Sequence, residues 1–337
     1  MKTQFSGFYR PTEADFRRLW KTCIFALDAN VLLNLYGYSE KTREEFLGLL
    51  ERLASRICMP HQFALEYQLH RARAIMEQVK NYAKAEKVLT ELYDEEFAPK
   101  HKHPFLSEKL LRQFGLIRQD LAKSRKKHEA LFTNDPYFDR ITAALRKVGS
   151  APTDQQLGEM YAKAKARYTL RVPPGFADLK EKGEPSGYGD CVGWFELMEM
   201  SKSESKPAIL VTDDAKEDWW HIQGDRTIGP RPELLMEFLK ECQQSFYMYS
   251  SDQFMKYART YLEEQVEQGA IEEIKERLQE ELRQKTGLKP KASAGAVTPR
   301  VAEKPTVPPE PLKPQDAKAV AQQRPREQQK TASPRTG

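Results

Sequence analysis

The sequence contains few cysteines, no long hydrophobic run and no apolar stretch at its start. No apolar run approaches the roughly 20 residues that a membrane-spanning helix needs, so we expect no membrane-embedded part. Residues 1–10 lack the apolar core of a secretory signal peptide. The four cysteines show no paired spacing, and three of them stand in apolar surroundings, as buried free thiols do in a reducing compartment. These absences argue against a secreted, disulfide-stabilised fold and predict a cytoplasmic protein.

A strong net charge is also absent from most of the chain. The formal charge is +5, but residues 286–337 hold ten Lys/Arg and four Asp/Glu, so this segment carries +6 and the remainder −1. The same segment has nine of the 21 prolines and no aromatic residue, so it cannot bury enough apolar surface to offset the entropy of ordering it. We therefore predict one folded domain over residues 1–285 and a disordered, basic, proline-rich tail over 286–337.

Two apolar runs, far apart in the chain, each end in an acidic residue. Residues 23–27 lead directly to Asp28, and residues 207–212 lead to Asp213 and Asp214. An unbroken apolar run is typical of a strand buried on both faces of a parallel sheet. An unpaired carboxylate is very costly in that interior, so it should emerge at the carboxyl edge, where open α/β folds bind ligands. If the first strand lies centrally, beside the strand of residues 207–212, the acids converge.

Helical patterns dominate the rest of the sequence. We expect short strands at 56–59 and 245–249, a helix at 232–242 and a long helix at about 251–285. Between about 70 and 172 only helical patterns occur, at 105–126, 135–147 and 153–168, which predicts a large helical insertion. In the long helix a narrow apolar seam suits either a short coiled coil or packing on the core, and it leaves open a homo-oligomer or a protein partner. The seam consists of Ile271, Ile274, Leu278 and Leu282.

Four acidic positions fall just past a predicted strand or in the first turns of the following helix. They are Asp28, Glu66, Asp190 and the Asp213/Asp214 pair. Individually, Asp28 and Asp214 are also good helix N-caps, but four carboxylates at one sheet edge repel one another unless cations lie among them. Hard divalent ions such as Mg²⁺ or Mn²⁺ suit oxygen ligands. Two such ions about 4 Å apart can activate a water and stabilise the leaving oxygen in phosphodiester cleavage.

Four motifs together resemble the PIN-like nucleases, in particular a bacterial branch with a long helical insertion. They are Leu-Asp-Ala-Asn-Val-Leu-Leu at 27–33, Pro-His-Gln-x-x-x-Glu at 60–66, Tyr-Gly-Asp at 188–190 and Leu-Val-Thr-Asp-Asp at 210–214. The likeness extends over residues 8 to about 257 and includes 173–180 and 213–220. It implies a three-layer αβα fold with a central parallel sheet and metal-dependent hydrolysis of RNA or branched nucleic acid.

The resemblance also assigns roles to individual residues. Asp28, Glu66, Asp190 and Asp214 match the metal-binding acids, and Asn30 and Thr212 match the positions that orient them. Asp213 is an additional acid, so the motif alone leaves open which of Asp213 and Asp214 binds metal. The family often has a short segment between its second and third acids, whereas this chain has more than a hundred residues there. Substrate preference therefore cannot be transferred from short relatives.

Basic residues near the acids are the candidates for contacts with a nucleic acid. Lys180 and Lys216 flank acidic positions and suit a scissile phosphate, although charged residues are more often simply solvated. Arg71 and Arg73 stand on the basic face of the helix that carries Glu66 and suit the nucleic-acid backbone.

We expect a metal-dependent endoribonuclease whose helical insertion shapes the substrate channel. A structure-specific DNA nuclease differs only in its substrate, and the sequence does not separate the two. A phosphotransferase with Asp28 as its nucleophile is disfavoured by Asn30, because phosphoaspartate hydrolases usually place a second acid there. A catalytically inactive nucleic-acid-binding scaffold is disfavoured because all the acids are present.

Overall fold

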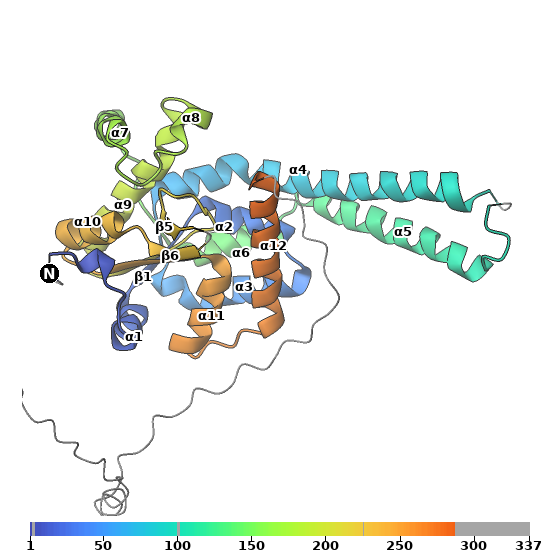
Figure 1. Cartoon of the computed structure of the whole chain (residues 1–337), viewed down its shortest axis with the longest axis horizontal. Helices are drawn as coiled ribbons and strands as arrows, with labels where there is room; N and C mark the ends of the chain where they lie inside the picture. The colour runs from blue at the N-terminus through green and yellow to red at the C-terminus, as the bar shows by residue number, and fades with distance from the viewer. Residues whose placement is uncertain (2–3, 100–101, 225, 287–337) are drawn as a thin grey trace, which may run out of the picture. The chain divides into compact units, whose positions relative to one another are not determined.

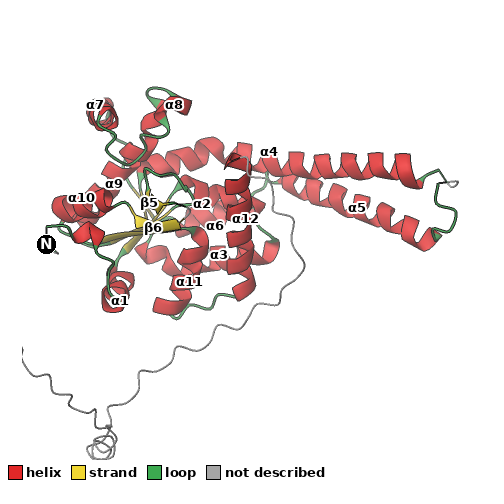
Figure 2. Cartoon of the chain, viewed as in Figure 1, coloured by secondary structure: helices red, strands yellow, loops and turns green. Residues whose placement is uncertain are grey.

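The computed structural model describes residues 1, 4–99, 102–224 and 226–286. The described residues belong to one compact unit that reaches Leu288, and they form a mixed α/β fold (Figures 1 and 2). Apart from Thr286, the tail predicted at 286–337 lies outside the described residues. No helix in the described ranges combines the length and the apolar character needed to cross a bilayer.

A parallel sheet lies at the centre of the fold, as predicted. Its strands β1 (Ile24–Leu27), β4 (Ala208–Val211) and β7 (Phe246–Tyr249) are ordered β1-β4-β7 and pair in parallel. On the other side of β1, a parallel bridge joins Phe25 to Ile57, just before β2 (Cys58–Met59), which pairs with β3 (Lys147–Val148). Every residue of β1 and β4 is buried. Strand β1 therefore lies between β2 and β4.

Helices cover one face of this sheet through an aromatic cluster. Trp20 of α1 (Glu13–Thr22) contacts both Phe25 of β1 and Phe254 of α11 (Ser251–Tyr261). Phe46 of α3 (Glu40–Leu53) packs against the same Phe254 ring. These four rings are buried and close one layer over the sheet.

A second aromatic cluster covers the opposite face. Trp194 of α9 (Gly189–Glu204) contacts Phe238 of α10 (Pro232–Cys242) and Phe246 of β7. Tyr249 lies three residues after Phe246 on the same strand, and it packs against Trp20 of the first cluster. Successive side chains of a strand point to opposite faces, so the two clusters lie on opposite sides of the sheet. The result is the expected three-layer αβα arrangement.

The predicted helical insertion consists mainly of a long helical hairpin. Helix α4 (His61–Leu92) leaves the core and runs through a π-helical turn at Tyr93–Phe97, and α5 (Glu108–Ala130) packs along it (Figure 1). Arg125 of α5 donates to Glu86 of α4 at 2.9 Å. No described residue of α4 beyond Ile75 is buried, and none of α5 is. The chain returns through α6 (Pro136–Ala144), β3 and α7 (Asp154–Thr169).

Two sequence predictions need correction, and one element was not predicted. The expected continuous helix at 251–285 is two helices, because α11 ends at Tyr261 and α12 (Gln268–Thr286) begins after a break in which Glu263 takes a φ of 59°. The insertion is not wholly helical, since β3 pairs with β2. An antiparallel hairpin of β5 (Trp220–Gln223) and β6 (Arg226–Pro230) was not predicted. Most of the apolar seam of α12 packs inside the chain: Ile271 and Ile274 are buried in the core and Leu278 packs against it, whereas Leu282 is exposed.

A candidate metal centre at the sheet edge

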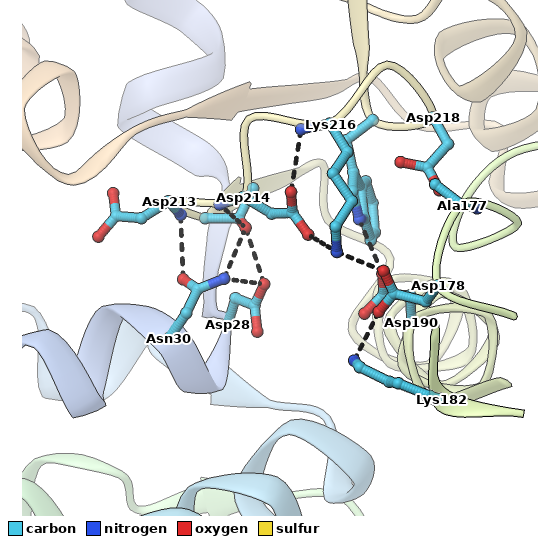
Figure 3. A network of polar contacts seen from close by, with 12 residues as sticks. Asp28, Asn30, Ala177, Asp178, Lys182, Asp190, Asp213, Asp214, Lys216 and Asp218 are labelled. Atoms are coloured by element: carbon cyan, nitrogen blue, oxygen red, sulfur yellow. Dashed lines mark hydrogen bonds and ion pairs between the residues drawn. The ribbon is translucent and has the colours of Figure 1, made fainter. Parts of the chain in front are cut away.

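The carboxyl ends of β1 and β4 are joined by side-chain hydrogen bonds. Asp28 follows β1, and its Oδ2 accepts from the Thr212 hydroxyl at 2.7 Å and from Asn30 Nδ2 at 2.7 Å. Asn30 Oδ1 in turn accepts from the backbone N–H of Asp213 at 3.0 Å. Asn30 and Thr212 thus hold the Asp28 carboxylate in one orientation, and both strand ends are fixed relative to each other (Figure 3).

The neighbouring residues Asp213 and Asp214 point in different directions (Figure 3). Asp213 accepts from the backbone N–H and the hydroxyl of Ser251, both at 2.8 Å, and from Asn34 Nδ2 at 2.9 Å. It therefore ties the start of α11 to the short helix α2 (Ala29–Asn34). Asp214 accepts from the backbone N–H of Lys216 at 2.9 Å and from its ammonium at 2.7 Å. Of the two, Asp214 is the one whose carboxylate lies in an acidic cluster.

Three carboxylates from separate segments make up that cluster. Oxygen atoms of Asp178, Asp190 and Asp214 all lie within 4.8 Å of one another. Asp190 stands in the first turn of α9 and accepts from the Trp219 indole N–H at 3.2 Å. Asp178 precedes the short helix α8 (Leu179–Lys182) and forms ion pairs with Lys182, at 2.5 Å, and with Lys216. Asp178 was not among the predicted site residues.

The sequence carried only a weak signal for Asp178. It lies within residues 173–180, a stretch that contributed to the family resemblance. No apolar strand precedes it, however, so the argument from strand ends could not find it. Its position depends on the loop between α7 and α8, which places the carboxylate beside two lysines from other turns.

A close helix–helix approach brings Glu66 to the same place. Glu66 lies in the second turn of α4, where Gln62 Nε2 donates to its Oε1 at 2.7 Å. A Cβ added to Gly189, the first residue of α9, would lie only 2.3 Å from that oxygen. With a larger residue at 189 the Glu66 carboxylate would have to move, so the glycine of the Tyr-Gly-Asp motif lets Glu66 reach the residue next to Asp190.

The pKa values of two of the acids are raised, which indicates that their ionised forms are disfavoured without positive charge nearby. Burial, then repulsion from Glu66, raises the pKa of Asp28 to about 7. Burial, then repulsion from Asp28, Asp178 and Asp214, raises the pKa of Asp190 well above its ordinary value. The opposite effect acts on Lys216, where attraction to Asp214 and Asp178 outweighs burial and raises the pKa of its ammonium. The donor atoms are all carboxylate oxygens, which fits a hard divalent cation such as Mg²⁺ or Mn²⁺.

The acids line one wall of a cleft of about 700 Å³. Asp28, Glu66, Asp190 and Asp214 all border it, so the structure brings the predicted metal-binding acids together. Basic side chains from several elements line it as well. They are His70 and Arg73 of α4, Lys182, Lys216, and Arg277 and Lys285 of α12. An acidic centre with cations around it is suited to a polyanion such as a nucleic-acid strand.

The other predicted substrate contacts lie elsewhere. Lys180 is exposed and does not border the cleft, whereas Lys182, one half-turn further, does. Arg71 is bound to Asp135 at 2.6 Å and stacks over the Phe138 ring, so it holds α4 against α6. Of the predicted basic residues, Arg73 and Lys216 are the ones that border the cleft.

Comparison with known proteins supports the interpretation of this edge. No curated protein and no solved structure matches the chain. One family model does match, described as PIN like domain, and it covers residues 24–234. That range begins at β1, ends in α10 and contains the three clustered acids Asp178, Asp190 and Asp214 as well as Asp28 and Glu66. The match spans well over half of the chain, which therefore belongs to the PIN-like domain family, whose members are typically nucleases.

Proposed function

We propose that the protein is a metal-dependent nuclease that hydrolyses phosphodiester bonds, most favourably in RNA. The observation that carries this proposal is the meeting of Asp178, Asp190 and Asp214, whose oxygens lie within 4.8 Å of one another at the carboxyl edge of the sheet. Asp28 and Glu66 border the same cleft. Maintaining so many acids in one place is costly without a bound cation, so the cluster is better explained by a metal than by fold stability.

The residues divide into metal ligands and groups that position them. Asp28, Glu66, Asp178, Asp190 and Asp214 would hold Mg²⁺ or Mn²⁺, and two ions are expected from the number of carboxylates. When bound, such ions supply an activated water and stabilise the leaving oxygen of the phosphodiester. Asn30 and Thr212 fix the Asp28 carboxylate by their hydrogen bonds. Their role is orientation, because both bond to a carboxylate oxygen.

Lys216 and Lys182 have a separate role beside the acids. Their ammonium groups contact Asp178, and that of Lys216 also contacts Asp214, so they partly neutralise the cluster before any substrate arrives. With cations bound to the carboxylates, these ammonium groups are free to donate to phosphate oxygens. We expect them to place the phosphate beside the centre and to offset the negative charge that builds up during cleavage.

The direct test is to incubate the purified protein with end-labelled RNA or DNA of one sequence, single-stranded and double-stranded. Each is assayed with Mn²⁺, Mg²⁺ or EDTA. The proposal expects RNA fragments in the presence of either metal and none with EDTA. Cleavage of DNA alone would make DNA the substrate and leave the proposed metal-dependent chemistry unchanged. Binding without cleavage under every condition would identify an inactive scaffold and refute the nuclease.

An Asp28→Asn variant provides the matched control for that assay. The amide keeps the shape of the side chain but removes the negative charge, so we expect cleavage to fall by at least about a hundredfold. Because burial and Glu66 already disfavour the charged form of Asp28, the folded protein should be as stable as the parent or more so. Urea unfolding measures stability, and full activity in this variant would refute the metal-site assignment.

A further inference from the structure

Helix α12 lies beyond the family match, which ends at residue 234, yet its residues border the same cleft as the acids. It is held firmly in place. Ile274 is fully buried, and the Glu273 carboxylate accepts three hydrogen bonds of 2.6 Å at the start of α3, from the N–H and hydroxyl of Ser39 and the hydroxyl of Thr42. A wall fixed in this way can present a side chain to the cleft at a defined position.

Arg277 is the side chain that this helix presents with the most defined geometry. Its guanidinium packs directly on the backbone of Gly37, where an added Cβ would lie 1.8 Å from Nη1 and 2.2 Å from Cζ. Its Cζ lies 5.5 Å from the centre of the Tyr38 ring, and its Nε donates to Glu281 Oε1 at 3.0 Å. The side chain is 27% exposed. Glycine, aromatic ring and carboxylate together fix the plane of the guanidinium.

The remaining N–H groups of Arg277 are available for another acceptor. Within the described ranges, neither Nη atom donates to a protein acceptor, and neither is a fully buried atom. A guanidinium whose plane is fixed and whose outer edge is open matches two oxygens of a phosphate. Arg277 borders the same cleft as the acidic centre but on a different element, so it is suited to a phosphate other than the one cleaved.

We propose that Arg277 binds a phosphate of the substrate strand that flanks the cleaved bond, in a site formed by Gly37, Tyr38 and α12. This inference rests on the proposed nuclease function. It makes Arg277 a substrate-positioning residue and extends the binding surface outside the part of the chain that matches the family. It also explains why residue 37 is glycine, because a larger side chain would displace the guanidinium.

Two different substitutions test this site by different means. Arg277→Ala removes the guanidinium. Gly37→Ala keeps the guanidinium but puts a methyl group where the guanidinium packs. The φ of Gly37, in the 3₁₀ turn Leu35–Gly37, lies outside the left-handed region, so the backbone tolerates alanine. Binding of a labelled single-stranded RNA is measured in EDTA, without cleavage. Each variant should bind about tenfold more weakly, and the double variant no more weakly than Arg277→Ala alone.

Further variants separate a specific contact from a general charge effect. Arg277→Lys keeps the charge but loses the two-pronged geometry, so its affinity should lie between those of the parent and Arg277→Ala. Lys240→Ala is the charge-matched control, since Lys240 of α10 is exposed and does not border the cleft. It should bind like the parent. A plot of log affinity against log salt concentration has a negative slope, and its magnitude should decrease by about 1 in Arg277→Ala and stay unchanged in the control.

The outcomes separate this inference from the proposed function. If the parent binds and cleaves RNA and Arg277→Ala does so equally well, the phosphate site is refuted and the nuclease stands. Effects of Gly37→Ala and Arg277→Ala that add in the double variant also refute it, because they would then act at different places. If the parent neither binds nor cleaves nucleic acid, both proposals fail. Thermal melting checks that each variant folds, and if Gly37→Ala does not, the Arg277 variants decide alone.

Discussion

At the scale of single residues, two adjacent aspartates have different partners. Asp213 and Asp214 follow β4 directly, yet the first holds Ser251 and Asn34 while the second lies among the acids of the centre. Successive residues leaving a strand point to opposite sides, which is enough to separate the two roles. The geometry therefore favours Asp214 as the proposed metal ligand, where the motif Thr-Asp-Asp left two candidates.

This difference predicts contrasting variants. Asp214→Asn should lose at least about a hundredfold in cleavage with little change in stability, because it removes a charge from the centre. Asp213→Asn should keep most of its activity but unfold about 1–2 kcal/mol more easily, because an amide cannot accept all three bonds that the carboxylate accepts. Cleavage assays and urea unfolding of both variants check the pair, and a reversed pattern would transfer the metal role to Asp213.

Glu196 is a buried acid outside the centre that makes stability depend on pH. Its Oε2 accepts from the backbone N–H of Gln62 at 2.7 Å and so satisfies the first turn of α4, which carries Glu66. Burial raises its pKa from 4.5 to about 7 despite that bond. Between these values the folded protein keeps the proton that the unfolded chain has lost. Its contribution to stability therefore falls as the pH rises through this window.

The Glu196→Gln variant should lack this contribution. Relative to the parent, it should become more stable by roughly 2 kcal/mol as the pH rises from about 4.5 to 7, because the amide has no charge to bury. Urea unfolding of both proteins across this range gives the difference directly. A constant difference between the two curves would show that folding does not raise the pKa of Glu196.

At the scale of secondary-structure elements, the most informative feature is how the ends of helices are held. Ser39 caps α3 by accepting from the N–H of Thr42, and Glu273 of α12 then bonds to the same Ser39 and to Thr42. One carboxylate thus fixes α12 against the N-terminus of α3, where the helix dipole also favours negative charge. These hydrogen bonds outweigh burial and lower the pKa of Glu273.

Loss of this carboxylate should loosen α12. Glu273→Gln should unfold about 1–2 kcal/mol more easily at neutral pH, because the amide replaces a charged acceptor of three bonds. Since the pKa of Glu273 is lowered in the folded protein, the stabilisation is present above its ordinary pKa of 4.5 and lost as the pH falls through the folded value. Parent and variant should therefore converge in acid, and hydrogen exchange of α12 locates the change.

The elements differ in how well the sequence predicted them. The buried strands were found because apolar runs that end in a charge have few alternative structures, and α10 was predicted with its observed bounds, Pro232–Cys242. The break between α11 and α12 was missed, because 262–267 contains no proline and its helical break depends on the packing of Ile271 and Ile274. Asp178 was missed for the same kind of reason, since tertiary contacts alone bring its loop to the centre.

At the scale of the whole molecule, the topology assembles the site. Parallel strands place all their carboxyl ends at one edge, so Asp28 and Asp214 meet although most of the domain separates them in the chain. That convergence could be predicted from two apolar runs. The part of the cleft that α12 forms could not be predicted, because nothing in the spacing of α12 indicates that Arg277 rests on Gly37.

The basic segment after the described domain gives a prediction at this scale. Removing residues 286–337, the segment predicted to be disordered, should leave the melting temperature unchanged, because its composition supports no core. RNA binding should weaken in a salt-dependent way, since the segment carries many positive charges. Calorimetry and binding at two salt concentrations measure both effects. A large fall in melting temperature would show that these residues belong to the fold.

The order of the strands has a consequence for the time at which activity arises. Strand β4, which is followed by Asp214, pairs with β1, the first strand of the sheet to be synthesised. A chain still growing on the ribosome holds Asp28 and Glu66 early, but Asp190 and Asp214 reach them only after α9 and β4 have been made and β4 has paired with β1. In the proposed nuclease, which would be made amid messenger and ribosomal RNA, the catalytic centre would thus be completed only late in the synthesis of the domain.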